Sequence, residues 1–228
     1  MNKFLDYGTG HYGKMLEYLA QHLQISGAAL FISLIIAIPL SVYLLKRKTL
    51  SKLVIALLGA CYAIPSMAFF AILMPIFGLG KTGAIVVLTV YSQFILTRNI
   101  LAAFNGIDGM VVESARGMGM SPMQVFFRVQ LPIAMPVIIG GIRIATISTI
   151  GSAVIAQTIN AGGIGVLLFE GLRSHNIAKM LWGTILAASL ALVCNFALER
   201  LERYTLRVSR GEIMRNNKGR TYTKWTTQ

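Results

Sequence analysis

Residues 106–132 read GIDGMVVESARGMGMSPMQVFFRVQLP, and they lie between two long apolar runs of the chain. Residues 111–116 are compatible with a short helix, and Gly117 and Gly119 then allow a sharp turn, because glycine adopts positive φ at little cost. Residues 121–124 (SPMQ) have the pattern of a helix start, with serine at the N-cap, proline at the first helical position and glutamine at the third. We therefore predict a helix–turn–helix elbow between two apolar helices.

The segments on either side of the elbow are long enough to cross a bilayer. A hydrocarbon core of about 30 Å is spanned by about 20 helical residues at 1.5 Å per residue. Backbone polar groups find no water inside that core, so each spanning run must pair its own hydrogen bonds as a helix. We predict about five spans, each close to the length that this core requires, over residues 24–45, 53–77, 83–104, 132–159 and 178–198.

The composition agrees with an all-α integral membrane protein. Of the 228 residues, 55% are hydrophobic and 13% are charged, whereas soluble domains carry about 25% charged residues. We predict one transmembrane domain over residues 24–198, which includes the elbow at 105–131. Before it, apolar residues at helical spacing indicate a short amphipathic helix within an external interfacial segment, residues 1–23. After it, residues 199–228 form a basic cytoplasmic tail.

Lysine and arginine are concentrated after the first span, after the third span and in the tail. These residues are Lys46, Arg47, Lys48, Lys52, Arg116, Arg128, Arg200, Arg203, Arg207, Arg210, Arg215, Lys218, Arg220 and Lys224. The positive-inside rule therefore predicts a multi-pass protein of the cell membrane with its N-terminus outside and its C-terminus in the cytoplasm. The same placement explains the net charge of +13 without a nucleic-acid partner. The tail could contact anionic lipid headgroups of the bilayer or be simply solvated.

The elbow also carries a specific motif. Residues 113–115 (ESA) are followed after three residues by Gly119 and, after nine more, by residues 129–132 (VQLP). This pattern resembles the EAA loop, E-A-A-x3-G-x9-I-x-L-P, of binding-protein-dependent ABC importer permeases, with Ser114 in place of alanine and Val129 in place of isoleucine. The resemblance implies a type I ABC importer permease fold in which the elbow is the coupling helix that docks on a cytoplasmic ATPase.

By this resemblance the elbow residues that couple the permease to the ATPase are Glu113, Ser114, Ala115, Gly119, Ser121, Met123, Phe126, Leu131 and Pro132. Met123, Phe126 and Phe127 supply an apolar face for such a contact. A compact, capped helix can transmit a rigid displacement from an ATPase to membrane helices, whereas a flexible loop cannot. The alternative is an amphipathic elbow at the membrane surface with no partner.

Four further segments narrow the resemblance to permeases of glycine betaine, carnitine and choline osmoprotectant importers. They are residues 63–66 (AIPS), 78–82 (GLGKT), 115–120 (ARGMGM) and 161–165 (AGGIG). The resemblance implies two permease subunits, identical or related, two ATPase subunits and an extracellular or periplasmic solute-binding protein. Import would occur by alternating access, and ATP would be bound by the partner, so this chain needs no cofactor.

A quaternary ammonium group donates no hydrogen bond, so aromatic faces are its natural ligands. The candidate pathway residues are Tyr62, Pro65, Ser66, Tyr91, Phe94 and Arg143. For the aromatic residues, core packing or lipid contact is the alternative. A charge within a span usually faces the protein interior, so Arg143 is a candidate for a buried pair or a pore-facing group. Arg98 is near the inner end of its span and could extend its side chain to the cytoplasm.

The connection between the fourth and fifth spans is predicted to lie outside. Its glycine-rich residues 161–165 fit a re-entrant turn against the pore or the binding protein, or plain close packing of helices. We expect the residues that face the binding protein to be Gly162, Gly163, Glu170 and Arg173, and a solvated loop is the alternative.

No catalytic or metal-binding constellation is present in the sequence. The three histidines and eight acidic residues form no triad and no metal-ligand spacing, so we expect a transport subunit and not an enzyme. Residues 78–82 end in GKT but lack the first glycine of a phosphate-binding loop, where Pro75 stands. The alternatives are a permease for an amino acid or another small solute, an ion-gradient transporter or a membrane scaffold. The ion-gradient class usually shows repeats and carboxylates within spans.

Overall fold

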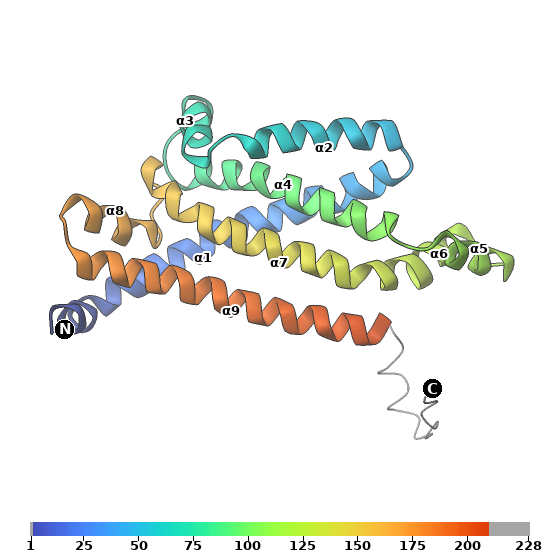
Figure 1. The fold of residues 1–228 in the computed structure, drawn as a ribbon. Coiled ribbons are helices and arrows are strands. Elements are labelled where there is room, and N and C mark those ends of the chain that lie inside the picture. Colours follow the sequence, from blue (N-terminus) through green and yellow to red (C-terminus); the bar gives the residue numbers. More distant parts are fainter. Residues whose placement is uncertain (1, 210–228) are drawn as a thin grey trace, which may run out of the picture.

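The computed structural model describes residues 2–209, and over this range the fold is all-α, as predicted (Figure 1). Its elements, in chain order, are α1 (Asn2–Leu45), α2 (Lys48–Ala63), α3 (Ser66–Phe77), α4 (Lys81–Asn105), α5 (Gly109–Gly117), α6 (Pro122–Val125), the π-helical segment η1 (Phe126–Gln130), α7 (Leu131–Ile155), the 3-10 segment η2 (Ala156–Ile159), α8 (Gly165–Arg173) and α9 (Ile177–Ser209).

The long helices lie side by side in one bundle (Figure 1). Helices α1, α4 and α9, and the helical stretch that contains α7, are each long and apolar enough to cross a membrane. Helix α4 is central and packs against both α1 and α7, whereas α9 packs against α7 and α8. The elbow, the α1–α2 connection and the last turns of α9 lie at the same end of the bundle, which we call the elbow end; the start of α1, with α3 and α8, lies at the opposite end.

Small and polar side chains allow the central helices to approach closely. The Ser33 hydroxyl of α1 donates to the Thr89 carbonyl of α4 (3.3 Å), and the Gln93 side-chain amide of α4 donates to the Ser33 carbonyl (3.1 Å). Ser92 of α4 and Thr149 of α7 share a hydrogen bond of 2.8 Å. These side chains are buried, and such contacts hold helices together where lipid supplies no hydrophobic driving force.

The expected second span, residues 53–77, is not one helix. The chain bends by 100° between α2 and α3. Pro65 supplies no backbone N–H and disfavours helical geometry at the residue before it, and Ile64 is accordingly extended, with φ −66° and ψ 130°. The described residues therefore contain four spanning helices, or five if the bent α2–α3 pair counts as one span.

The helices at both ends of the chain extend beyond the spans predicted for them. A kink at His11 divides α1 (Asn2–Leu45) into two helical parts, and the second part runs past residue 23 into the first span, with the side chain of His22 fully buried in the bundle. At the other terminus α9 does not end at residue 198 but continues to Ser209. The remainder of the predicted basic tail, residues 210–228, lies outside the described residues.

The longer α9 supplies a partner for Arg143. The Nε atom of Arg143 on α7 lies 3.3 Å from a carboxylate oxygen of Glu202, a residue that we had assigned to the tail. Both side chains are about three-tenths exposed, at 28% and 30%. Arg143 therefore joins α7 to α9, which agrees with the structural-pair alternative.

Candidate functional site

The elbow is shaped by hydrogen bonds within its own residues. Asp108 is the N-cap of helix α5, and its carboxylate accepts from the Met110 backbone N–H (2.9 Å). Helix α6 begins with a complete capping box, in which the Ser121 hydroxyl accepts from the Gln124 N–H (3.4 Å) and the Gln124 side chain accepts from the Ser121 N–H (2.8 Å). The capping box predicted from the sequence is therefore confirmed.

The turn between α5 and α6 depends on Gly119. Its φ of +82° is in the region that favours glycine, whereas Gly117 is the last residue of α5 and not part of the turn, contrary to our expectation. A Cβ added at Gly119 would have nothing within 4 Å. The backbone conformation, and not lack of space, therefore requires glycine at this position.

Two buried residues and a ring stack anchor the elbow to the bundle. Ala115 and Val125 are each 2% exposed. The ring of Phe126 stacks on Phe104 at the end of α4, with centroids 5.5 Å apart. Phe126 is half-buried, so it helps to hold the elbow in place, and its assignment to the coupling residues stays a prediction.

The exposed surface of the elbow includes large apolar side chains. Met123 and Phe127 are 67% and 55% exposed, and the sequence analysis placed both on the apolar face. Met110 and Met118 extend this surface at 70% and 76% exposed, and we had not assigned them to the site. Glu113 and Ser114, the first two residues of the ESA motif, are exposed as well. We call this surface the elbow face.

The elbow continues directly into the fourth span. Helix α6, the π-helical η1, α7 and η2 follow one another without an interruption from Pro122 to Ile159. The half-buried Leu131 and Pro132 form the first turn of α7 and are not the end of a loop. A displacement of α6 therefore acts on α7 through a continuous helical backbone.

Three of the candidate pathway residues meet where the chain bends between α2 and α3. Tyr62 stacks on Phe94 (centroids 5.1 Å apart) and meets Tyr91 edge-on (5.5 Å). The Tyr91 hydroxyl donates to the Ile64 carbonyl next to the bend. Phe69 of α3 also packs edge-on against Tyr91, at 5.2 Å. We call Tyr62, Phe69, Tyr91 and Phe94 the aromatic cluster.

The other candidate pathway residues differ in their placement. Pro65 and Ser66 form the bend itself, with Pro65 exposed and Ser66 half-buried. Arg143 lies between α7 and α9 and is not part of the aromatic cluster. The guanidinium of Arg98 lies 5.7 Å from the centre of the Phe94 ring, a contact that the sequence analysis did not anticipate.

The glycine-rich turn at the opposite end of the bundle packs inward. Gly163 is buried, its N–H donates to the Gln21 side chain of α1 (3.0 Å), and a Cβ added to it would lie 3.0 Å from the His22 ring. The Gly162 N–H donates to Gln157 (3.1 Å). The burial and contacts of Gly163 favour the close-packing alternative over the predicted contact with a binding protein. Gly162 is half-buried.

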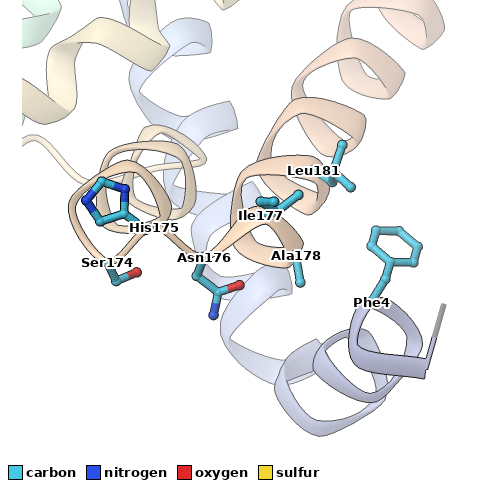
Figure 2. Close-up of a pocket in the computed structure, with 7 residues that line it drawn as sticks. All are labelled: Phe4, Ser174, His175, Asn176, Ile177, Ala178 and Leu181. Atoms are coloured by element: carbon cyan, nitrogen blue, oxygen red, sulfur yellow. The ribbon is translucent and has the colours of Figure 1, made fainter.

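The residues after this turn are accessible. Glu170 is exposed and pairs with Lys179 (2.9 Å), and Arg173 is exposed. Beside them the α8–α9 connection and the start of α1 border an open pocket of about 500 Å3. Its lining residues are Phe4, Ser174, His175, Asn176, Ile177, Ala178 and Leu181 (Figure 2). Phe4 stacks on Trp182 at 4.7 Å, so the first turn of α1 forms one wall of this pocket.

Comparison with known proteins places these features in a family. Residues 29–207 match the model of the family described as binding-protein-dependent transport system inner membrane component. The chain is 35% identical over 194 residues to the carnitine transport permease protein OpuCB of Listeria monocytogenes, covering 85% of this chain and 88% of the relative. It is 33% identical to the glycine betaine/carnitine/choline transport system permease protein OpuCB of Bacillus subtilis (strain 168), covering 89% and 94%.

The fold has a similar counterpart among solved structures. A chain of the MetNI methionine ABC transporter, in an inward-facing conformation, superposes with a TM-score of 0.77 at 24% identity, covering 84% of this chain and 95% of that chain. This confirms the predicted type I importer permease fold for a multi-pass membrane protein. The length of the family match and the identity of the relatives agree, and the chain belongs to the family of binding-protein-dependent transport system inner membrane components.

Proposed function

We propose that this chain is the permease subunit of an ATP-driven importer for quaternary ammonium osmoprotectants such as glycine betaine, carnitine and choline. The observation that carries the proposal is the elbow face, an exposed apolar surface on a capped elbow that continues into a spanning helix. Exposed apolar patches on a polar end of a protein mark contact sites. The solute class is supported by relatives at 33–35% identity, which are named as carnitine, glycine betaine/carnitine/choline and choline transport permeases.

The partners follow from this role. A cytoplasmic ATPase dimer binds ATP and docks on the elbow face, so the permease itself holds no cofactor. A second permease subunit, identical or related, completes the pathway, and an external binding protein delivers the solute to the opposite end of the bundle. Exposed Glu170 and Arg173 are then its candidate contacts.

The proposed orientation places the elbow end in the cytoplasm. The basic connection between α1 and α2, the elbow and the last turns of α9 all lie at this end (Figure 1), as the positive-inside rule requires. Single cysteines in place of Met118 and Arg173, each introduced after Cys61 and Cys194 have been replaced by alanine, would report the orientation in intact cells. We expect a membrane-impermeant maleimide to label the second and not the first, and the reverse pattern would contradict the assignment.

The test of the function is co-purification and uptake with the ATPase and binding protein. Met123→Glu places a charge on the elbow face, and we expect it to lower ATPase recovery about tenfold, because an unpaired charge in an apolar contact is costly. Leu172→Glu is the matched control, since Leu172 is also exposed (57%) but lies on α8 at the opposite end. Equal ATPase recovery with both variants would contradict the coupling role.

Uptake of labelled solutes then separates the substrate classes. We expect glycine betaine, carnitine or choline to stimulate ATP hydrolysis by the complex. Stimulation by an amino acid alone would keep the permease function and change its solute, because fold does not fix substrate. Uptake that follows an ion gradient without ATP would contradict the proposal as a whole.

A further inference from the structure

One side of α4 combines aromatic rings with a cation. Tyr91, Phe94 and Arg98 follow one another at helical spacing and so lie on one face of this helix. Tyr62 stacks on Phe94, and the Arg98 guanidinium lies over the same Phe94 ring, 5.7 Å from its centre. The Phe94 ring therefore contacts both an accessible aromatic ring, Tyr62, and a guanidinium, Arg98.

Arg98 is exposed within a spanning helix. It lies about 10 Å along α4 from the helix end at Asn105, at 1.5 Å per residue, and none of the ion pairs within the described residues involves it. Ionisable side chains within spans generally face the protein interior or a water-filled cavity. Tyr62, its neighbour across Phe94, is 36% exposed, so both an aromatic ring and a cation are accessible on this face.

The bend after α2 adds a favourable field for a positive ligand. Helix α2 ends at Ala63, next to Tyr62, and the carboxyl end of a helix carries partial negative charge. The Tyr91 hydroxyl holds the Ile64 carbonyl and so fixes this helix end against α4. Interrupted helices whose ends point at charged ligands are a recurring device of transporters.

We propose that Tyr62, Phe94 and Arg98 form a site that selects zwitterionic quaternary amines during translocation. The trimethylammonium group contacts the exposed surface of Tyr62 by a cation–π interaction. The carboxylate of the same molecule pairs with the Arg98 guanidinium, which matches carboxylate geometry. Phe94 contacts both side chains and positions them. The inference rests on the proposed function, since it names the residues with which that permease distinguishes its solutes.

The site makes a prediction about substrate choice. Glycine betaine and carnitine carry both a quaternary ammonium and a carboxylate, whereas choline carries a hydroxyl in place of the carboxylate. Arg98 therefore binds the carboxylate of glycine betaine and of carnitine and has no such partner in choline. An arginine that only extends to the membrane surface would affect all three solutes alike, or none of them.

The experiment measures uptake of the three labelled solutes by cells that produce the complete importer. We expect Arg98→Gln to lower glycine betaine and carnitine uptake about tenfold or more, and choline uptake less than about threefold, because only the carboxylate loses its partner. Arg98→Lys keeps a positive charge and should recover carboxylated solutes to within about threefold of wild type. Tyr62→Leu should lower the uptake of all three solutes by similar factors, because they share the ammonium group.

Arg47→Gln is the matched control. Arg47 also lies over a tyrosine ring, 4.8 Å from the centre of Tyr43, but at the α1–α2 connection of the elbow end. Its substitution should not change the ratio of choline to carnitine uptake.

The outcomes separate the inference from the function on which it rests. Equal losses of all solutes in Arg98→Gln, or no loss, would overturn the selectivity site while leaving the importer assignment intact. If the wild-type importer takes up only carboxylated solutes, the test is the comparison of uptake by Arg98→Gln with uptake by Arg98→Lys. Equal losses of uptake in these two variants would overturn the site. A wild-type complex that takes up none of the three solutes would contradict the proposed function, and the inference would fail with it.

Discussion

The elbow and the glycine-rich turn at the opposite end contain the same kind of residue in different surroundings. Gly119 in the elbow and Gly163 in the turn both have positive φ, at +82° and +78°. An added Cβ has no neighbour within 4 Å at Gly119, but at Gly163 it lies 3.0 Å from the buried His22. Gly119 shapes the elbow, which hydrogen bonds between neighbouring residues stabilise. Gly163 allows the glycine-rich turn to pack on α1. A glycine-rich turn in a sequence therefore does not reveal whether it serves docking or packing.

The largest effect is expected at the packed turn. Gly163→Ala should destabilise the protein by about 2–4 kcal/mol, because it combines an unfavourable φ with a close contact to His22. Thermal unfolding in detergent would measure the change, and Gly151→Ala is the control, since Gly151 is helical with open space around it. An unchanged unfolding temperature for Gly163→Ala would show that the turn is not packed as described and would favour a docking role.

Loss of the hydrogen bond between Gly163 and Gln21 should have the next largest effect on stability. Gln21→Leu removes the acceptor of the Gly163 N–H and should cost about 1–3 kcal/mol, because it leaves a buried donor without a partner. Gln24→Leu is the control on the same helix, where the side chain is exposed and accepts only from Lys81 (3.0 Å). If both variants unfold at the same temperature, the contact between the turn and α1 contributes nothing to stability.

In the elbow we expect a functional effect with little change in global unfolding. Gly119→Ala costs about 1–2 kcal/mol in the turn alone, because a Cβ disfavours positive φ. We expect solute uptake to fall about fivefold or more, the factor that corresponds to this energy, while the unfolding temperature stays near that of wild type. Gly117→Ala is the control, since Gly117 is helical and open. Normal uptake in the Gly119 variant would show that the turn geometry does not matter for coupling.

The smallest effect is expected at the cap of α6. Ser121→Ala removes one half of the capping box and should cost about 1 kcal/mol, confined to the elbow. Amide hydrogen exchange should therefore become faster around Gln124 but not in α4 or α7. Faster exchange throughout the bundle would show that the elbow is not the locally stabilised unit described above.

Local features of the fold could be predicted from the sequence, because they depend on neighbouring residues. The capping box at Ser121, the turn at Gly119 and the two uninterrupted spans that became α4 and α7 each follow from short-range patterns. The apolar exposure of Met123 was also predictable, since an elbow between spans leaves its apolar residues without a core. The coupling residues as a functional set remain a prediction until the ATPase contact is measured.

Features that depend on distant residues could not be predicted in this way. Proline alone does not identify the break at Pro65, because Pro39 and Pro136 lie inside continuous helices. The bend is held by a contact from another helix, the hydrogen bond from Tyr91. The pair of Arg143 with Glu202 was missed for a related reason, since α9 was expected to end before the acidic residue.

The uninterrupted helix from Pro122 to Ile159 has a mechanical consequence. Its 38 residues measure about 57 Å at 1.5 Å per residue, so one continuous helical segment reaches from the elbow to the far end of the bundle. There Gln157 accepts from Gly162, and the next residue of that turn is fastened to α1 through Gln21. A displacement of α6 is therefore transmitted to α1 as well as to α7. Weakening the hydrogen bonds of Gln157 and Gln21 would reduce the part of that displacement that reaches α1.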